Sequence, residues 1–247
     1  MAESCFLAKL KHYIELTESE KSALRTLEEP PKAFAAGSVI YEEQESPAGN
    51  LYLVDEGRLH SSTALADGSR AILRIYYPGD IIGVNSIAFE RSATTTVTSV
   101  PTGLCKFPRS RLAEVFENHP RLATLFYALA ALENVALQDR LKSIGRTDGK
   151  SRIAALIMDV LSRLRTTSPD MPPTVNLMMT QGDIGDAVGL TNVHVHRCLK
   201  ELADEGFIRR HGSEITVLRE EELVERAHFI NRYRSIDTSW FPPPAAG

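Results

Sequence analysis

The stretch TQGDIGDAVGLTNVHVHRCLKEL, residues 180–202, decides how the C-terminal part of this chain folds. Its two halves each carry an apolar face at helical spacing, made of Ile184, Val188, Val195, Leu199 and Leu202. Gly189 supplies a turn between the halves, Thr191 is a suitable N-cap for the second, and Gly185 or Ala187 is small enough for a close approach of two helices. The pattern predicts a helix-turn-helix, with helices over residues 181–188 and 192–205.

The second predicted helix has a polar face opposite its core face. At about 100° per residue, Val193, His196, Arg197 and Lys200 cluster there, and Asn192 lies at the flank of the first turn. Such side chains contact bases and phosphates. Because any surface helix is polar on its outer side, this face alone is weak evidence for DNA binding. It supports DNA binding only in combination with the turn glycine, the N-cap and the two core stripes. The predicted DNA contacts are Thr180, Gln181, Thr191, Asn192, Val193, His194, His196, Arg197 and Lys200.

Residues 207–217 read as a β-hairpin around His211-Gly212-Ser213. Arg209 and Arg210 would place positive charge near a phosphate backbone, which makes this hairpin the wing of a winged helix-turn-helix. A helix is predicted over residues 220–234, and the end of the chain from Phe241 onward is expected to be exposed and poorly ordered.

Upstream of the helix-turn-helix, two amphipathic helices are predicted, over residues 120–144 and 150–165. The first carries a stripe that needs a partner, and one candidate partner is the same helix of a second chain. Its stripe consists of Leu122, Leu125, Leu129, Leu132 and Ala136, widened by Phe126, Leu137, Leu141 and Ile144. Gly145–Gly149 is expected to break the helix and act as a hinge.

Residues 32–109 have a different sequence pattern, in which short runs of β-branched and aromatic residues are separated by Gly, Pro, Asn and Asp. Closely spaced short strands of this kind indicate a small β-barrel or roll, and Asp67-Gly68 is its clearest hairpin turn. Before it, residues 7–27 read as one or two helices, with Thr17 and Glu20 forming a capping box.

The bulk composition sets limits on function. The 247 residues carry a net charge of −4, so nucleic-acid binding must rest on a local surface rather than on overall charge. Three scattered cysteines argue against a disulfide framework and for a reducing compartment. With no signal peptide and no long apolar run, we expect a cytoplasmic protein without a membrane association.

The sequence offers little support for a metal site or for catalysis. His194 and His196 point about 200° apart on a helix and cannot chelate one ion, whereas His194 and Cys198 could, although Cys198 fits better as a small core residue. No metal site is therefore predicted. The sequence lacks a phosphate-cradling glycine loop and the spacing of known catalytic sets, so an enzyme is not expected.

In order and spacing, four segments make the chain resemble the Crp/Fnr family of bacterial regulators. They are Leu51–Gly57, Gly79–Gly83, Glu90–Ala93 and Thr180–Leu202. The resemblance implies an α+β protein: a jelly-roll-like double-stranded β-helix as sensor over residues 1–119, a dimerisation helix over 120–146, and a winged helix-turn-helix over 147–219, followed by a helix and tail over 220–247. It also implies a homodimer on a palindromic double-stranded operator, with RNA polymerase as a further partner.

The resemblance also implies a ligand pocket made of Gly83, Val84, Asn85, Arg91, Ser92, Leu137 and Gln138. Arg91 and Ser92 match a phosphate-binding pair, while Arg91 could equally be a structural ion-pair partner. Val84 stands where cyclic-AMP-binding members have a glutamate, and it cannot accept the ribose hydrogen bond. No cofactor is assigned, and a cyclic nucleotide or another small molecule stays open as the effector. Cys5 is alone near the N-terminus, which disfavours an iron–sulfur sensor.

Two functions follow. The first is a signal-responsive transcription regulator. The second is a cyclic-nucleotide-binding module that acts through protein contacts, for which an apolar patch on the helix over residues 192–205 would be more typical.

Overall fold

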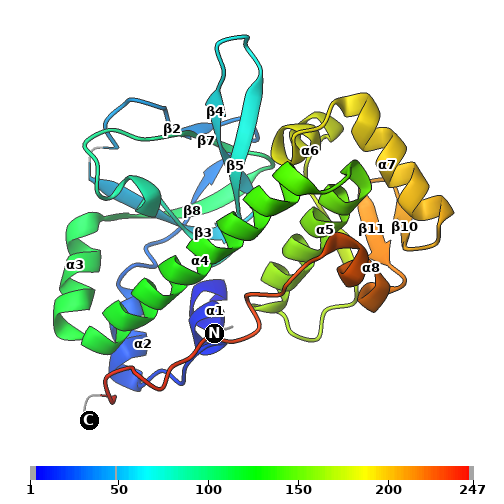
Figure 1. The fold of residues 1–247 in the computed structure, drawn as a ribbon. Helices are drawn as coiled ribbons and strands as arrows, with labels where there is room; N and C mark the ends of the chain where they lie inside the picture. The colour runs from blue at the N-terminus through cyan, green and yellow to red at the C-terminus, as the bar shows by residue number, and fades with distance from the viewer. Residues whose placement is uncertain (1–3, 48, 245–247) are drawn as a thin grey trace. The chain divides into compact units, whose positions relative to one another are not determined.

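The computed structural model describes residues 4–47 and 49–244, shown in Figure 1. They divide into two compact units. Unit 1 contains residues 4–65, 73–131 and 235–244, and unit 2 contains residues 66–72 and 132–234.

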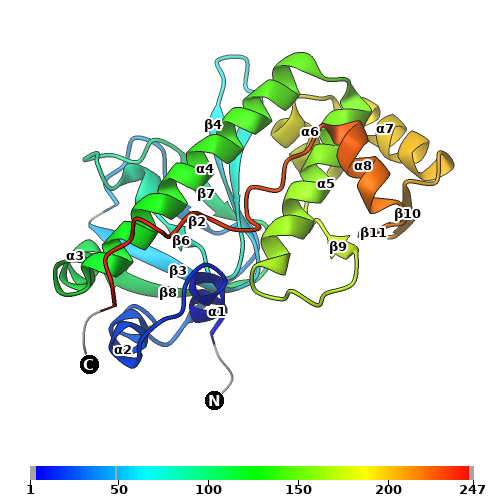
Figure 2. The same ribbon diagram turned by 60° about the horizontal axis from the view of Figure 1, so that its bottom comes forward.

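Unit 1 begins with two short helices, α1 (Cys5–Lys11) and α2 (Glu18–Arg25). Ser4 caps α1, and the predicted capping box of Thr17 and Glu20 is present at α2. Figure 2 shows both helices beside the strands β3 and β8. The helices bury Phe6, Leu10 and Leu24 in one apolar cluster with residues of those strands.

The β-roll, which belongs to unit 1 except for the β4–β5 turn and the start of β5 within residues 66–72, is built from two four-stranded sheets with strand orders β1-β8-β3-β6 and β2-β7-β4-β5. Its strands are β1 (Lys32–Phe34), β2 (Val39–Tyr41), β3 (Asn50–Glu56), β4 (Leu59–Ala64), β5 (Arg70–Tyr76), β6 (Ile81–Ile82), β7 (Thr95–Thr98) and β8 (Thr102–Pro108), with a short 3-10 helix η1 (Val84–Ser86) after β6. The predicted turn at Asp67-Gly68 joins β4 to β5, and Gly68 takes a φ of 81° that suits glycine. The expected β architecture is therefore confirmed.

Helix α3 (Arg109–Asn118) leads into the long helix α4 (Pro120–Arg146). Pro120 occupies the first position of α4, where its missing N–H costs nothing. The expected break within Gly145–Gly149 is confirmed, because α4 ends at Arg146, although the helix continues through Gly145 itself. A single helical glycine costs only about 1 kcal/mol, and the next helix starts with its own cap, Asp148.

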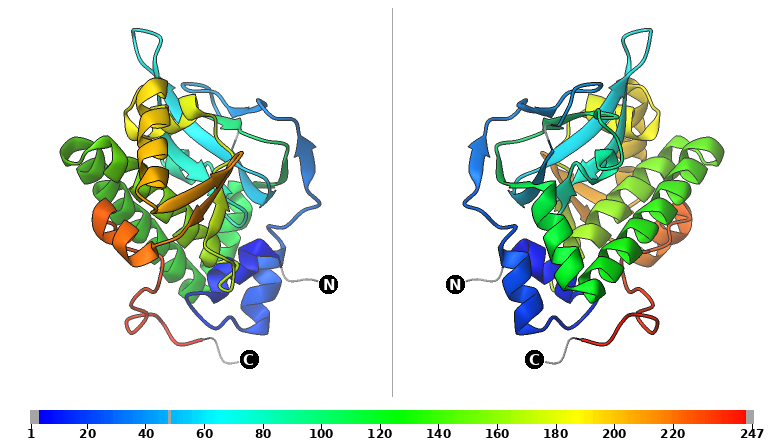
Figure 3. Two further views of the ribbon diagram at one scale, coloured as in Figure 1. Left: turned by 90° about the vertical axis from the view of Figure 1, so that its right-hand side faces the viewer. Right: turned by 90° about the vertical axis from the view of Figure 1, so that its left-hand side faces the viewer.

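Unit 2 holds the predicted helix-turn-helix, formed by α6 (Gln181–Val188) and α7 (Asn192–Asp204), with nearly the expected boundaries. The elements around it are α5 (Gly149–Arg165), β9 (Thr174–Asn176), β10 (Ile208–His211), β11 (Glu214–Val217) and α8 (Glu220–Ala227). The wing is a three-stranded sheet in the order β10-β11-β9. Strand β9 was not expected, although the alternation of buried Val175 and Leu177 is its signal. Figure 3 shows α7, in gold, with the wing strands in orange beside it.

Two expectations for the C-terminus need correction. Helix α8 ends at Ala227 rather than near residue 234, because His228 adopts a left-handed conformation and the Phe229 N–H bonds the Val224 carbonyl, which closes the helix. Phe241, which was expected to be exposed, is half-buried against the apolar cluster of unit 1. Pro243 and Pro244 are exposed as predicted, and residues 245–247 lie outside the described part of the chain.

No helix within residues 4–47 and 49–244 combines the length and the apolar character needed to cross a membrane.

Candidate nucleic-acid interface and sensor site

The turn between α6 and α7 depends on two glycines. Gly189 has a φ of 68° and caps α6 in the left-handed region, where glycine carries no Cβ penalty. At Gly185, an added Cβ would lie 2.4 Å from the Leu190 carbonyl oxygen. Gly185 is therefore the close-approach residue, and Ala187 is instead a core residue with an exposed fraction of 1%.

The core of the motif is buried as predicted. Val195, Leu199 and Leu202 are at most 1% exposed, and Ile184 and Val188 of α6 are buried as well. Cys198 is buried too, beside the start of α5, where a Cβ added to Gly149 would lie 3.0 Å from its Sγ. Cys198 therefore packs inward and does not form a ligand pair with His194.

The opposite face of α7 lies in solvent. Val193 is 81% exposed, and the side chains that share its face are Asn192, His196, Arg197 and Lys200, all exposed. Thr191 caps the helix by accepting the His194 N–H at 3.3 Å. Apart from Val193, the face is polar, so it lacks the apolar patch typical of a protein-docking helix.

The basic residues of α7 form ion pairs along their own helix. The Lys200 ammonium lies 2.5 Å from the Asp204 carboxylate, and the Arg197 guanidinium lies 3.7 Å from that of Glu201 and contacts the His194 ring. Exposed pairs of this kind contribute only about 0–1 kcal/mol. A phosphate or a base edge can therefore replace the carboxylate at little cost.

The wing presents its arginines outward. Arg209 and Arg210 of β10 are exposed, and Ile208 and Ile215 of the same hairpin are buried. The predicted contacts of the wing are therefore accessible for phosphates.

Sequence reasoning missed a residue that acts on α6. Thr180 caps α6 in a capping box with Asp183, as its position allows. Arg70 binds the same carboxylate at 2.5 Å and that of Asp186, one turn on, through its Nε at 3.0 Å. Arg140 of α4 donates to the carbonyls of both Ile72 and Ala187, which ties the segment over residues 66–72 into unit 2. Nothing local in the sequence pairs Arg70 with a residue more than 100 positions away.

Arg70 shifts the ionisation of its partner. Burial alone would raise the pKa of Asp183, but hydrogen bonds from Thr180 and from Arg70 outweigh it, so the pKa lies below its ordinary value. Asp183 is therefore a carboxylate at neutral pH, and Arg70 compensates acidic charge next to the predicted contacts Thr180 and Gln181.

Three of the predicted ligand-pocket residues of unit 1 lie at the short helix η1: Gly83 is its N-cap, and Val84 and Asn85 belong to it. Gly83 has a φ of 96°, and a Cβ there would lie 2.6 Å from the Tyr41 hydroxyl, so Tyr41 fills the space above it. Val84 is half-buried and Asn85 is exposed. The Tyr41 hydroxyl donates to the Asn50 carbonyl at 2.6 Å, which holds the ring in place.

Arg91 and Ser92 differ in orientation. Arg91 is exposed, and its guanidinium donates to the Gln44 carbonyl at 2.9 Å, so the side chain lies at the surface of the roll and not inside it. Ser92 is buried, and its hydroxyl donates to the Thr94 carbonyl at 2.7 Å. The remaining N–H groups of an arginine fork can still reach an anion while one group holds a carbonyl.

Leu137 and Gln138 lie on α4 in unit 2. Leu137 is 48% exposed, and Gln138 is exposed with its amide bound to Asn134 at 3.0 Å. Both therefore present side chains to solvent in this chain.

The inside of the roll is more polar than the sequence suggested. The buried Ser61 hydroxyl lies 3.0 Å from the hydroxyls of both Tyr76 and Thr96, and His60 bonds Ser99 at 2.9 Å. The alternation of small polar residues along β4 and β7 is the signal that could have revealed this network.

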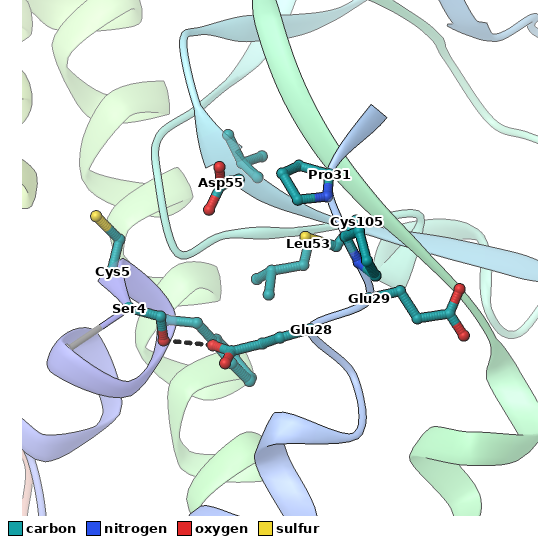
Figure 4. Close-up of a pocket in the computed structure, with 11 residues that line it drawn as sticks. Ser4, Cys5, Glu28, Glu29, Pro31, Leu53, Asp55 and Cys105 are labelled. Atoms are coloured by element: carbon teal, nitrogen blue, oxygen red, sulfur yellow. Dashed lines mark hydrogen bonds between the residues drawn. The ribbon is translucent and has the colours of Figure 1, made fainter. Parts of the chain in front are cut away.

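A cavity of about 210 Å³ lies in unit 1, between α1 and the strands β3 and β8 (Figure 4). It is lined by Cys5 and Cys105 among others, with Asp55 close by and Ser4 bonded to Glu28. Burial, followed by the charge of Asp55, raises the pKa of Cys5 and raises that of Cys105 to about 11. Both thiols are therefore neutral at physiological pH and poor nucleophiles or metal ligands.

Two family profiles match the chain. Residues 31–119 match the cyclic nucleotide-binding domain, and residues 151–226 match the Crp-like helix-turn-helix domain. The first range covers the β-roll with α3, and the second covers α5 to α8.

Several known proteins are similar over most of the chain. The nitrogen fixation regulation protein FixK of Azorhizobium caulinodans is 29% identical over 79% of this chain and 78% of its own. The fumarate and nitrate reduction regulatory protein of Escherichia coli K12 is 24% identical over 91% and 89%. The structure of FixK2 from Bradyrhizobium japonicum superposes with a TM-score of 0.70 at 26% identity, over 79% of this chain and 95% of that one.

The names of these relatives describe regulators and not enzymes. Helix α7 has one exposed, polar face and one buried face. Neither observation favours the second function, a module that acts through protein contacts. The chain belongs to the Crp/Fnr family and is a DNA-binding transcriptional regulator.

Proposed function

We propose that this regulator works as a homodimer on a two-fold-symmetric operator, with an affinity set by a signal sensed in the β-roll. The observation that carries the dimer is an exposed seam on α4, defined as Tyr127, Ala130, Asn134, Leu137 and Leu141. Steps of three and four residues alternate along it, which is the spacing of a coiled-coil contact.

The seam is distinct from the stripe that α4 buries within its own chain. Leu122 and Leu125 are fully buried, whereas Tyr127 is 70% and Leu141 is 72% exposed. Large apolar side chains at such exposure on one helical face indicate a protein contact. The same seam of a second copy fits it, because a two-fold axis brings identical positions together.

The DNA contacts proposed for each protomer divide into two kinds. Asn192, Val193, His196 and Arg197, near the start of α7, would face base edges in a major groove, as recognition helices do. Thr180, Gln181, Thr191, Lys200 and the wing residues Arg209 and Arg210 would hold phosphates. His194 lies at the edge between the two sets.

The sensor half of the proposal concerns Arg91 and Ser92. An anionic small molecule, including a cyclic nucleotide, would meet the N–H groups of the Arg91 fork other than the one that bonds the Gln44 carbonyl. Val84 offers no acceptor for a ribose hydroxyl, so an effector other than cyclic AMP fits at least as well. RNA polymerase is the further partner that a transcription regulator of this kind would contact.

The central experiment is selection of duplexes from random oligonucleotides by the purified protein, with and without cyclic AMP. We expect a two-fold-symmetric motif that Arg197→Ala loses and that Arg234→Ala, a matched exposed arginine outside the interface, retains. Loss in both variants or in neither would contradict the assignment of Arg197. A motif without symmetry would contradict the dimer.

The dimer has its own test in sedimentation. Leu141→Glu places a charge in the seam and should shift the protein to the mass of one chain, because a buried unpaired charge opposes association. Leu65→Glu changes a side chain that is 53% exposed outside the seam and should leave the mass unchanged. Dimers that persist in Leu141→Glu would refute the seam.

A further inference from the structure

The chain does not end with the winged helix-turn-helix. The second family match stops at residue 226, and α8 stops at Ala227. Residues 228–244 then continue without a regular helix or strand. They contain three apolar side chains that are buried or packed, Tyr233, Ile236 and Phe241. A merely solvated tail would not bury such residues.

The first part of this segment is anchored in unit 2. Tyr233 is 4% exposed, and the Arg163 guanidinium lies over its ring at 4.5 Å. Arg163 is held in turn by both carboxylate oxygens of Glu133, at 3.0 and 2.9 Å. The neighbouring Arg232 bonds Asp139 at 2.7 Å, so charge and ring contacts fix this end.

The electrostatics of Arg163 support this anchor. Burial alone would lower the pKa of Arg163, but Glu133 and Asp159 outweigh it and hold the pKa above its ordinary value. The guanidinium therefore stays charged and can hold the ring of Tyr233 at any physiological pH.

The second part is anchored in unit 1. Ile236 and Phe241 pack against the apolar cluster that contains Phe6, Leu122 and Leu125. Phe241 and the prolines after it line a cavity of about 420 Å³ together with Tyr13 and Arg121. Figures 1 and 2 show this end of the chain beside α2.

A local turn presents Phe241 to the cluster. The Asp237 carboxylate accepts the Ser239 N–H at 2.9 Å, and the Phe241 N–H bonds the Thr238 carbonyl at 3.1 Å. The Trp240 indole N–H bonds the Asp237 carbonyl at 3.1 Å, and its ring meets that of Phe241 edge-on at 5.0 Å. Residues 237–241 are thus folded on themselves, which lowers the entropy lost on docking.

We propose that residues 228–244 are a tether with one anchor in each unit, and that DNA binding by unit 2 is coupled to the docking of Phe241 in unit 1. The coupling rests on the DNA-binding function assigned above, whereas the docking does not. By linkage, if DNA changes the docking of Phe241, then loss of that docking changes the affinity for DNA by the same factor.

The sequence supplies its own probe, because Trp240 is the single tryptophan of the chain. Its contact with Phe241 makes its fluorescence a report on the second anchor. The experiment measures Trp240 emission and the Kd for the selected operator duplex, in the full-length wild type, in Phe241→Ala and in Ile230→Ala. Ile230 is 48% exposed and provides the matched apolar control within the same segment.

We expect operator binding to change the emission of the wild type. Phe241→Ala should shift the emission toward that of a solvated indole and change the operator Kd by about fivefold or more, and Ile230→Ala should do neither. An altered emission with an unaltered Kd would overturn the coupling. An unaltered emission in Phe241→Ala would overturn the anchor.

Two further measurements keep these outcomes separable. A wild type that binds no duplex would overturn the DNA-binding assignment, while the emission shift of Phe241→Ala still decides the docking. If Phe241→Ala does not fold, the experiment uses instead a chain that ends at Arg234, which keeps the first anchor and lacks the second. That chain should show the same change in Kd, and an unchanged Kd in a folded truncated chain would overturn the tether.

Discussion

Helix α7 and the β-roll place their predicted site residues in different ways. On α7, the predicted contacts other than His194 share one exposed face of one helix, and the residues between them are buried. In the roll, the predicted residues come from separate segments, and they diverge: Ser92 is buried, Arg91 lies outside on the Gln44 carbonyl, and Tyr41 fills the space at Gly83. A site on one helix is set by periodicity, whereas a site on a roll depends on how distant strands pair.

The largest effect is expected at the turn of the helix-turn-helix. Gly185→Ala drives a Cβ against the Leu190 carbonyl, so unit 2 should lose about 1–3 kcal/mol of stability and operator binding should fall with it. Thermal unfolding and a DNA titration measure both. Gly182→Ala, on the same helix, meets only the Thr180 hydroxyl at 3.5 Å and should be neutral or slightly stabilising. Equal losses in the two variants would refute the close approach.

The second effect contrasts the two sites directly. Arg197→Ala should weaken operator binding by about 1–3 kcal/mol, because the side chain faces the DNA from α7. Arg91→Ala should leave the effector-free affinity unchanged, since Arg91 is exposed and bonds the Gln44 carbonyl of its own roll. Fluorescence anisotropy with a labelled duplex measures both variants. If Arg91→Ala weakened operator binding more than Arg197→Ala does, the assignment of α7 as the DNA-contacting site would be wrong.

The third effect concerns Arg70 and pH. The net lowering of the Asp183 pKa stabilises unit 2 at neutral pH, and this contribution is lost as the pH falls through the folded-state pKa. Arg70→Gln removes one of the interactions that lower this pKa, so the variant should be less stable than the wild type at neutral pH, and the difference in stability should shrink as the pH falls through the acidic range. The side chain of Arg70 is 37% exposed, so solvent screening limits the effect to about 1 kcal/mol or less.

Thermal midpoints followed by circular dichroism across the acidic range test this. Arg91→Gln serves as the control, because it removes an arginine from the roll without touching Asp183. A pH profile of Arg70→Gln that is parallel to the wild type would show that Arg70 does not act through this carboxylate.

The smallest effect is a lack of reactivity. With a pKa of about 11, Cys105 has a thiolate fraction of about one in a thousand at pH 8. Iodoacetamide labelling of the native protein, read by mass spectrometry, should therefore modify the exposed Cys5 well before Cys105. Modification of Cys105 at the rate of Cys5 would mean that its burial between β3 and α1 is frequently lost.

The sequence predicted those parts of the molecule in which a residue's environment depends on near neighbours. The bounds of α6, the capping box at Thr17 and the buried stripe of Val195, Leu199 and Leu202 all follow from local spacing. The same reasoning failed for α8, because the apolar spacing does not mark the left-handed His228 at which the helix ends.

The remaining features join residues that are far apart in the chain. Arg70 reaches Asp186 across more than 100 positions, and Phe241 reaches a cluster that begins with Phe6. Periodicity contains no information about such pairs, since each partner alone has an ordinary composition and spacing. The two apolar stripes of α4 were predicted as one broad stripe for the same reason, because only the fold shows which part is already covered.

The polar position in the seam of α4 bears on how a cell keeps similar regulators apart. Asn134 lies among apolar seam residues, where its Oδ1 accepts a hydrogen bond from Gln138 of its own chain, and its amide N–H groups would be satisfied by a partner that offers a polar group at the same height. A related chain with leucine there would leave those N–H groups without that acceptor, which disfavours the mixed pair. We therefore expect Asn134 to promote self-recognition, so that subunits of co-expressed relatives sort into their own dimers.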